Sequence, residues 1–267
     1  MSEVSIVSIG AGNLAHHFIP ALHKKGCNIL QVFSRNLDNS KKLALKVKAT
    51  ATDDLEDIYT DADLYLIMVH DDAIRSVINA LPQLNEHQIL AHSSGATPTL
   101  LLAKKSMNYG SFYALQSFKK HQSQDLAEVP FLIFGNNSDA TRRLRMLARQ
   151  LSPIVKEVDD NDRLRYHLAA VLMNNFTNHL ACKTREFLEE HTLDPAILQP
   201  IIAASFDKII INNPCEIQTG PAIRNDLNIE AKHLKLIEQD AYLTAIYKSH
   251  SQSIKNSNQQ KIDDENS

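Results

Sequence analysis

Residues 4–15 read VSIVSIGAGNLA, a β-branched run that passes into the pattern Gly-x-Gly-x-x-Ala. The run predicts a strand, and the small residues after it have separate tasks in the turn. Gly10 makes the tight turn, Gly12 lets the backbone approach a pyrophosphate, and Ala15 keeps the strand and the next helix close. This order of residues is typical of the first βαβ unit of a dinucleotide-binding fold.

Helical periodicity follows the turn over residues 13–25, and Gly26 stands where a helix C-terminal glycine belongs. The backbone amides of Asn13 and Leu14 open this predicted helix. Unpaired amides at a helix N-terminus hold phosphate groups. A plain glycine turn is the alternative, but the strand before it and the helix after it favour a phosphate-binding turn.

The end of the second predicted strand, at residues 28–33, indicates which nucleotide binds. An NAD site places Asp or Glu there to bind the ribose 2′-hydroxyl. This chain has Ser34, Arg35 and Asn36 instead. Arg35 can pair with a 2′-phosphate, and the other two side chains can donate hydrogen bonds. We therefore expect NADP as the cofactor; a solvated surface arginine is the alternative for Arg35.

Strands and helices alternate through the first half of the chain. Strands are predicted at residues 4–9, 28–33, 64–69, 88–92, 109–113 and 130–134. Helices are predicted at residues 13–25, 37–48, 71–81, 97–105 and 138–151. This alternation is typical of a doubly wound parallel sheet, and the apolar run at 64–69 fits a strand buried on both faces.

The second half differs, because residues 136–219 contain no glycine. Helices are predicted at about residues 163–190, 195–211 and 228–249. The charged residues 156–162 predict a joint between two domains. We expect an NADP-binding Rossmann domain over residues 1–157, an all-α domain over residues 158–250, and a disordered polar tail over residues 251–267.

Composition excludes several classes of protein. The chain has 267 residues and a formal net charge of −3, which gives no field for nucleic acid or an anionic membrane. Three scattered cysteines without a Cys-x-x-Cys pair predict no disulfide framework and no metal site. The sequence lacks a signal-peptide pattern and any apolar run near the roughly 18 residues of a transmembrane helix. We expect a soluble cytoplasmic protein.

Polar residues follow the predicted strands at their carboxyl ends, where open α/β sheets bind ligands. The candidates for cofactor contact there are Val69, His70 and His92. The candidates for contact with the substrate or the nicotinamide amide are Ser93, Ser94, Gln116 and Ser117. The alternative is that these residues only turn the chain and cap its elements.

A polar stripe marks the first long helix of the second half. His167, Asn174 and Asn178 share one face at about 100° per residue. Asparagine is a poor helix former, which favours a role for this face. We expect His167 to act as acid or base and the two asparagines to orient the substrate. Arg163 and Glu189 lie near the same stripe, so a solvated face is the alternative.

The second half has one Gly-Pro turn, within residues 219–226. Arg224 can clamp a carboxylate or phosphate of the substrate, and Asp226 or Asn228 can cap the last helix. We take Arg224 and Asp226 as substrate-binding candidates. A structural pair between them is the alternative.

Several of these motifs carry a resemblance over about residues 4–250. They are GAGNLA at Gly10, ADLYLIMV before His70, HSSGA at His92, LQSF at Leu115, YHLAAVLMNNFTNHL at Tyr166 and GPAIRND at Gly220. The chain resembles NADP oxidoreductases that join a Rossmann domain to a helical domain of unknown function. Their relatives are pyrroline-5-carboxylate reductase and the 3-hydroxyisobutyrate and 6-phosphogluconate dehydrogenases. The chain has Tyr113-Ala114 where these relatives have His-Pro, and His167 stands near the lysine of the dehydrogenases.

The resemblance implies a helical domain like that of 6-phosphogluconate dehydrogenase and a homodimer formed through its helices. It also implies hydride transfer between NADP and a small C=O or C=N substrate held between the domains. Two alternatives remain open. The missing lysine motivates a non-catalytic NADP-binding sensor or scaffold, and the third possibility is a deazaflavin-dependent NADP reductase.

Overall fold

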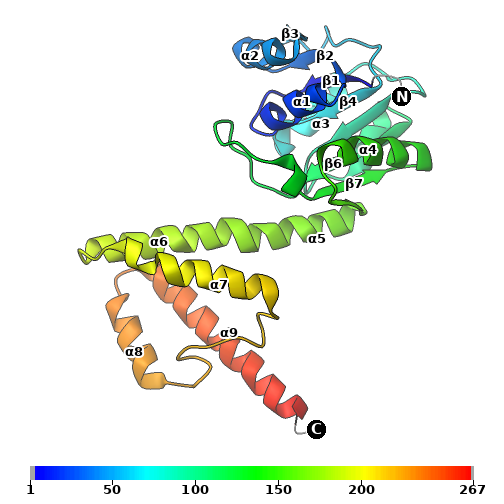
Figure 1. Cartoon of the computed structure of the whole chain (residues 1–267). Helices are drawn as coiled ribbons and strands as arrows, with labels where there is room; N and C mark the ends of the chain where they lie inside the picture. The colour runs from blue at the N-terminus through cyan, green and yellow to red at the C-terminus, as the bar shows by residue number, and fades with distance from the viewer. Residues whose placement is uncertain (1–3, 266–267) are drawn as a thin grey trace. The chain divides into compact units, whose positions relative to one another are not determined.

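The computed structural model describes residues 4–265, which divide into two compact units between Asn175 and Phe176 (Figure 1). This division lies beyond the predicted boundary between residues 157 and 158. Helix α5 (Asp160–Ala170) groups with the first unit, because Arg163 at its start is bonded to the sheet and to the loop beside it.

An eight-stranded sheet forms the centre of the first unit, in the order β3-β2-β1-β4-β5-β6-β7-β8. The strands are β1 (Ser5–Ile9), β2 (Asn28–Phe33), β3 (Thr50–Thr52), β4 (Leu64–Ile67), β5 (Ile89–His92), β6 (Asn108–Ala114), β7 (Phe131–Gly135) and β8 (Val155–Glu157). All neighbours pair in parallel except β6 and β7. The strand order reverses between β1 and β4, where doubly wound folds place their ligand.

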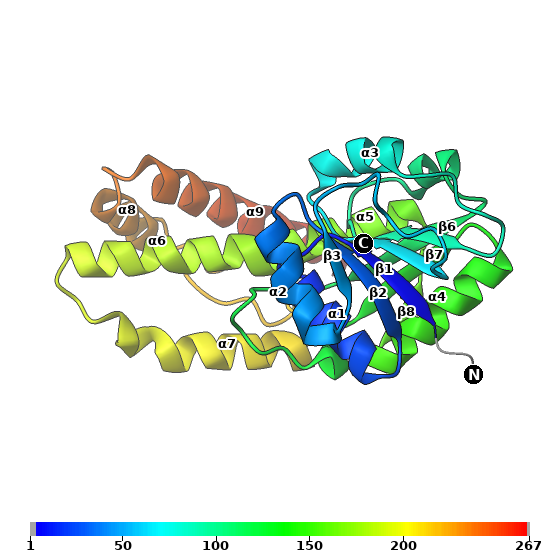
Figure 2. The same ribbon diagram turned by 90° about the horizontal axis from the view of Figure 1, so that it is seen from above.

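Helices cover both faces of this sheet (Figure 2). Helices α1 (Ala15–Lys24), α2 (Leu37–Val47) and α4 (Ser138–Leu151) pack on one face, and α3 (Asp71–Ala80) packs on the other. On the first face, Phe18 of α1 lies against Phe112 of β6 and Phe131 of β7, with ring centroids 5.9 and 5.3 Å apart. This aromatic cluster fixes α1 to the sheet and so fixes the turn that precedes it.

Three features of the first unit differ from the sequence predictions. β3 and β8 have only three residues each, too few for a hydrophobic pattern to mark them. The predicted parallel sheet is wrong at β7, whose antiparallel direction comes from its tertiary pairing with β6. Residues 99–104 form a 3-10 helix instead of the predicted α-helix at 97–105. Residues Val155–Glu157 add an edge strand, and the joint predicted at 156–162 shares two of these residues.

Helices alone make up the second unit among the described residues. A π-helical segment, Val171–Phe176, leads into α6 (Thr177–Glu190), and α7 (Gln199–Ile211), α8 (Leu227–Leu236) and α9 (Ala241–Glu265) follow. Within residues 4–265, none of the helices combines the length and the apolar character that crossing a lipid bilayer requires.

The last part of the chain differs from the predictions in two ways. The single helix expected at residues 228–249 is divided at residues 237–240, and Asp240 caps α9 by accepting from the backbone N–H of Leu243 at 2.9 Å. The tail expected to be disordered from residue 251 continues α9 to Glu265. Lys255 accounts for part of this order, because its Nζ donates to Glu230 of α8 at 2.7 Å.

Candidate active site

The turn after β1 has no room for a side chain at Gly10. Its φ is +128°, and a Cβ there would lie 2.2 Å from the carbonyl oxygen of Met68. The backbone N–H of Gly10 donates to the carbonyl of Phe33 at 2.9 Å, so the turn is held between the ends of β2 and β4. The backbone therefore leaves the sheet directly above the strands where their order reverses.

The start of α1 is open to an anion. Its first turn contains no acidic residue, and its N-cap residue Leu14 gives no side-chain hydrogen bond. Among residues 4–265, nothing accepts a hydrogen bond from the backbone N–H groups of Gly12, Asn13 or Leu14. Three unpaired amides beside the positive end of a helix are the donor set that a pyrophosphate takes.

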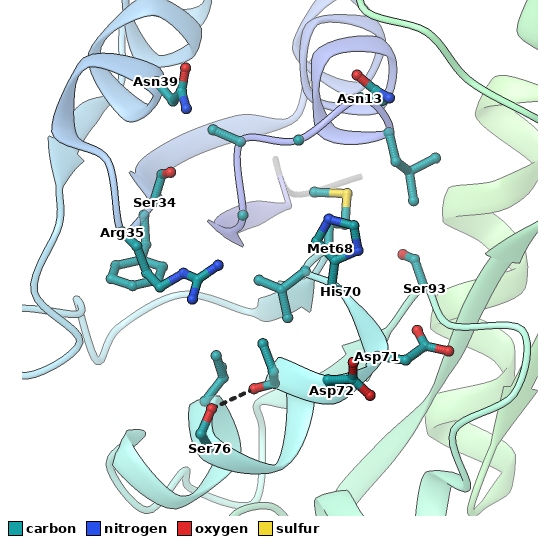
Figure 3. A pocket seen from close by; sticks show the side chains of 18 of the residues that line it. Asn13, Ser34, Arg35, Asn39, Met68, His70, Asp71, Asp72, Ser76 and Ser93 are labelled. Atoms are coloured by element: carbon teal, nitrogen blue, oxygen red, sulfur yellow. Dashed lines mark hydrogen bonds between the residues drawn. The ribbon is translucent and has the colours of Figure 1, made fainter.

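A cavity of about 900 Å³ extends from this turn along the ends of four strands (Figure 3). Nine of the predicted site residues line it: Gly10, Gly12, Asn13, Leu14, Ser34, Arg35, Val69, His70 and Ser93. Asp71 and Asp72, at the start of α3, also line the cavity. The structure thus brings together residues from β1, β2, β4 and β5 at one place.

Arg35 points into this cavity from the side opposite Ser93 (Figure 3). The side chain is exposed and forms no ion pair or hydrogen bond within the described part of the chain. Ser34 accepts from the backbone N–H of Asn36 at 3.3 Å, and Asn36 caps α2 through the N–H of Asn39. The guanidinium of Arg35 is therefore available to a ligand, which fits a 2′-phosphate at this point.

His92 does not line the cavity, although the sequence placed it among the cofactor contacts. Its side chain is completely buried, and Nδ1 accepts from the backbone N–H of Ser94 at 3.2 Å. Burial and the nearby charge of Arg163 lower the pKa of His92 to about 4. Its imidazole is therefore neutral, and it supports the loop after β5 from beneath.

Ser93 and Ser94 differ in the hydrogen bonding of their hydroxyl groups. The Oγ of Ser94 accepts from the backbone N–H groups of Ala96 and Thr97, so it shapes the turn. The side chain of Ser93 is nine-tenths buried yet lines the cavity, and its Oγ has no hydrogen-bond partner among residues 4–265. A buried hydroxyl without a partner is costly unless a ligand supplies one.

Tyr113 and His167 form a pair that the sequence analysis missed. The Tyr113 hydroxyl lies 2.9 Å from His167 Nδ1, and the two rings meet edge to face. Burial raises the pKa of Tyr113 to about 12; the positive charge of Arg163 opposes this rise, and the carboxylate of Asp71 adds a still smaller effect in the same direction as burial. The hydroxyl therefore keeps its proton at neutral pH. The one sequence signal was the Tyr113-Ala114 departure from the His-Pro of related proteins.

Gly95 provides the space that His167 occupies. A Cβ on Gly95 would lie 2.6 Å from Nδ1 and 2.7 Å from Cγ of His167. The loop after β5 and the imidazole on α5 are thus in direct contact. The position of His167 is fixed by Tyr113 on one side and by the loop backbone on another.

The remaining candidates are divided between the two units. Asn174 donates to Ser117 Oγ at 2.7 Å, while Gln116 is exposed and accepts from the N–H of Ser117. Asn178, Arg224 and Asp226 belong to the second unit. Asp226 caps α8 by accepting from the N–H of Ile229, as predicted. Within residues 4–265, Arg224 is exposed and makes no ion pair with Asp226.

Two family models match the chain. The model described as "NADP oxidoreductase coenzyme F420-dependent" matches residues 5–92, and a domain of unknown function, DUF2520, matches residues 129–254. No curated protein sequence matches it. The first match covers the strands and turn that form the cavity.

Solved structures similar to this chain support the same fold. The "putative NADP oxidoreductase" of Bacteroides fragilis is 34% identical with a TM-score of 0.87, over 95% of this chain and 98% of that one. A reductive aminase of Aspergillus terreus in complex with NADPH is 10% identical (TM-score 0.73, 94% and 95% covered). The 1-pyrroline-5-carboxylate reductase of Streptococcus pyogenes is 13% identical (TM-score 0.65, 96% and 100% covered). These similarities confirm the predicted Rossmann domain followed by a helical domain.

Proposed function

Because the chain belongs to the family of NADP oxidoreductases that includes the Bacteroides fragilis protein, we propose that it transfers hydride between the nicotinamide of NADP and a small C=O or C=N substrate. The observation that carries this proposal is the cavity at the strand ends. Three features lie together there: Arg35 and the amides of residues 12–14, which have no partner among residues 4–265, and the backbone at Gly10, which carries no side chain. Arg35 suits the 2′-phosphate of NADP, the amides suit its pyrophosphate, and the absence of a side chain at Gly10 lets the backbone lie close to the nucleotide.

The protein's own groups bind the cofactor and deliver a proton. When bound, NADPH supplies the hydride at the nicotinamide. In this proposal the Tyr113 hydroxyl, which keeps its proton, donates to Nδ1 of His167 and so places an imidazole proton on Nε2. As His167 gives its Nε2 proton to the oxygen or nitrogen of the substrate, its Nδ1 takes up the proton of the Tyr113 hydroxyl, so the imidazole stays uncharged and Tyr113 regains its proton from water. In this proposal Ser93 binds the amide of the nicotinamide or a substrate oxygen through its unpartnered hydroxyl.

Substrate contacts are proposed for residues of both units. Asn174, already bonded to Ser117, orients the substrate from the first unit. Asn178 and Arg224 are the candidates from the second unit, and Arg224 suits an anionic group of the substrate. Gln116 and Ser94 already form hydrogen bonds within their own loops, so we expect them to contribute least to substrate binding.

Replacing Arg35 by alanine tests the cofactor assignment. We expect Arg35→Ala to weaken NADPH binding by roughly 10- to 100-fold, because a hydrogen-bonded charge contributes about 1.5–3 kcal/mol. NADH binding should stay unchanged, because NADH has no 2′-phosphate. The fluorescence of each nucleotide, titrated with purified protein, measures both affinities.

Arg75 provides the matched control. It is an exposed arginine on α3 that does not line the cavity, so Arg75→Ala should leave NADPH affinity within about twofold. Equal weakening by the two substitutions would show a general charge effect and overturn the assignment. Tight binding without turnover of any substrate would favour the sensor or scaffold instead.

A second candidate function has one specific observation behind it. The family model that matches residues 5–92 is described as coenzyme F420-dependent, and F420 is a deazaflavin. A deazaflavin-dependent NADP reductase would use that coenzyme as its hydride partner in place of a small imine or carbonyl. An absorbance change on mixing NADPH, the deazaflavin and the protein would identify it, whereas turnover of an imine without deazaflavin would exclude it.

We propose a homodimer formed through the helices of the second unit. Helix α7 reads QPIIAASFDKIII and has no buried residue. Large apolar side chains are exposed on and beside it, with exposed fractions of 76% at Ile197, 63% at Ile201 and 78% at both Ile210 and Ile211. A helix apolar on all sides is normally covered, and a second copy of this chain carries the complementary surface.

Sedimentation velocity should therefore give a dimer for the wild-type protein. The double substitution Ile210→Glu and Ile211→Glu should shift it to a monomer, because it introduces charge into the covered surface. Leu45→Glu is the control, since Leu45 is 84% exposed on α2 in the first unit. A monomeric wild type, or an equal effect of Leu45→Glu, would contradict the proposal.

A further inference from the structure

Arg163 is the largest completely buried side chain among those described. Its Nη1 donates to Ser111 Oγ at 3.1 Å and to Asp160 Oδ1 at 2.6 Å. Its Nη2 donates to the backbone carbonyl of Thr97 at 2.5 Å. One guanidinium thus connects α5, β6 and the loop after β5. Its burial contradicts, at this position, the alternative of a solvated face for the polar stripe.

Asp160 completes the connection. Its Oδ1 accepts from Arg163, and its Oδ2 accepts from the backbone N–H of Thr99 at 2.8 Å and from the Thr99 hydroxyl at 3.1 Å. The start of α5 is therefore attached twice to residues 97–99. Arg163 and Asp160 also form an ion pair with each other, in which Arg163 is completely buried and the Asp160 side chain is 33% exposed.

The same geometry reaches the Tyr113–His167 pair. His167 follows Arg163 by four residues, so the two side chains share one face of α5. Tyr113 follows Ser111 by two residues, so those side chains share one face of β6. The Arg163–Ser111 contact and the His167–Tyr113 contact therefore join the same face of α5 to the same face of β6, one next to the other. The loop attached to Arg163 and Asp160 also contains Gly95, against which His167 packs.

An ion pair with a buried partner is a poor device for stability, because apolar side chains of similar volume fill such a space at no greater cost. The guanidinium of arginine differs in geometry: its planar donors hold three acceptors in fixed directions, whereas the donors of a lysine ammonium rotate freely. The Nε of Arg163 has no partner among the described residues, so the side chain is held by its two terminal nitrogens alone.

We propose that Asp160 and Arg163 are positioning residues that hold the His167 imidazole on the Tyr113 hydroxyl, and so set the proton donor relative to the substrate. This inference rests on the proposed function, in which the Tyr113–His167 pair delivers a proton to the substrate. The geometry itself, however, is measurable without turnover.

The test is the ¹⁵N NMR signal of the His167 imidazole at one fixed neutral pH, in the full-length protein with NADPH bound. His167→Gln assigns the signal by its disappearance. In wild type we expect one tautomer, with Nδ1 as hydrogen-bond acceptor. In Arg163→Lys, which keeps the charge but has a single nitrogen, we expect a mixture of tautomers. NADPH affinity should stay within about twofold, because Arg163 does not line the nucleotide cavity.

Two variants that leave Arg163 in place serve as the test if Arg163→Lys does not fold. Asp160→Asn removes the charge partner, and Ser111→Ala removes one acceptor; we expect the His167 signal to shift in both, more in the first. Unchanged His167 signals in every folded variant, with only a lower melting temperature, would make Arg163 a structural residue and overturn the inference. Failure of the protein to bind NADPH would instead overturn the proposed function.

Discussion

Gly10→Ala should abolish NADPH binding and lower the free energy of unfolding by about 3 kcal/mol or more. A Cβ at Gly10 would lie 2.2 Å from a backbone oxygen of Met68, which cannot rotate away as a side chain does. The φ of +128° adds strain of its own for any residue with a Cβ. Titration with NADPH measures the loss of binding, and chemical denaturation measures the change in the free energy of unfolding.

A substitution at Gly12, in the same turn, should weaken NADPH binding without a large effect on stability. A Cβ at Gly12 would meet only the Met68 carbonyl oxygen, at 3.9 Å, so Gly12→Ala should change stability by no more than about 0.5 kcal/mol. We expect it to weaken NADPH binding by about tenfold or more, because the methyl group would stand between the backbone and the pyrophosphate. Normal NADPH affinity in Gly12→Ala would show that the nucleotide does not approach this turn.

His167→Gln should lower kcat by roughly 10²- to 10⁴-fold, the usual contribution of a general acid, with NADPH affinity unchanged. The readout is NADPH oxidation in the presence of a panel of small cyclic imines and ketones. Gly95→Ala should lower kcat as well, because its methyl group would displace the imidazole from Tyr113. Glutamine preserves much of the volume of histidine, so the stability of His167→Gln should stay close to wild type.

The double variant Gly95→Ala with His167→Gln provides the control. If Gly95 acts only through the imidazole, the second substitution adds little to the loss caused by the first. Additive losses would assign Gly95 a separate role. Full activity in His167→Gln would remove His167 from the reaction.

The nucleotide half of the fold was predictable because its signals are local. A β-branched strand, two glycines and a helix stand next to one another in residues 4–25, and Arg35 directly follows the second strand. Each of these signals depends on neighbours in sequence. The structure accordingly places Gly10, Gly12, Asn13, Leu14 and Arg35 around one cavity.

The surroundings of the proposed proton donor were less predictable, because their contacts join residues that are distant in sequence. Tyr113 and His167 are 54 residues apart, and Arg163 reaches Thr97 over 66 residues. Helical periodicity identified His167 but did not indicate that Arg163 is buried, since an arginine within a polar stripe is usually solvated. His92 ends a strand whose four residues are all buried, and its polar side chain alone suggested a place in the cavity.

Strand β8 has a consequence for how the protein behaves at high concentration. Like β3, it is an edge of the sheet with only three residues, and an uncovered edge invites pairing with a strand of another molecule. Its central and last residues, Lys156 and Glu157, are charged and exposed, and they are engaged by Tyr166 and Arg145. A foreign strand would have to desolvate these charges and displace both partners. The charged segment that the sequence suggested was only a joint therefore also resists aggregation by strand addition.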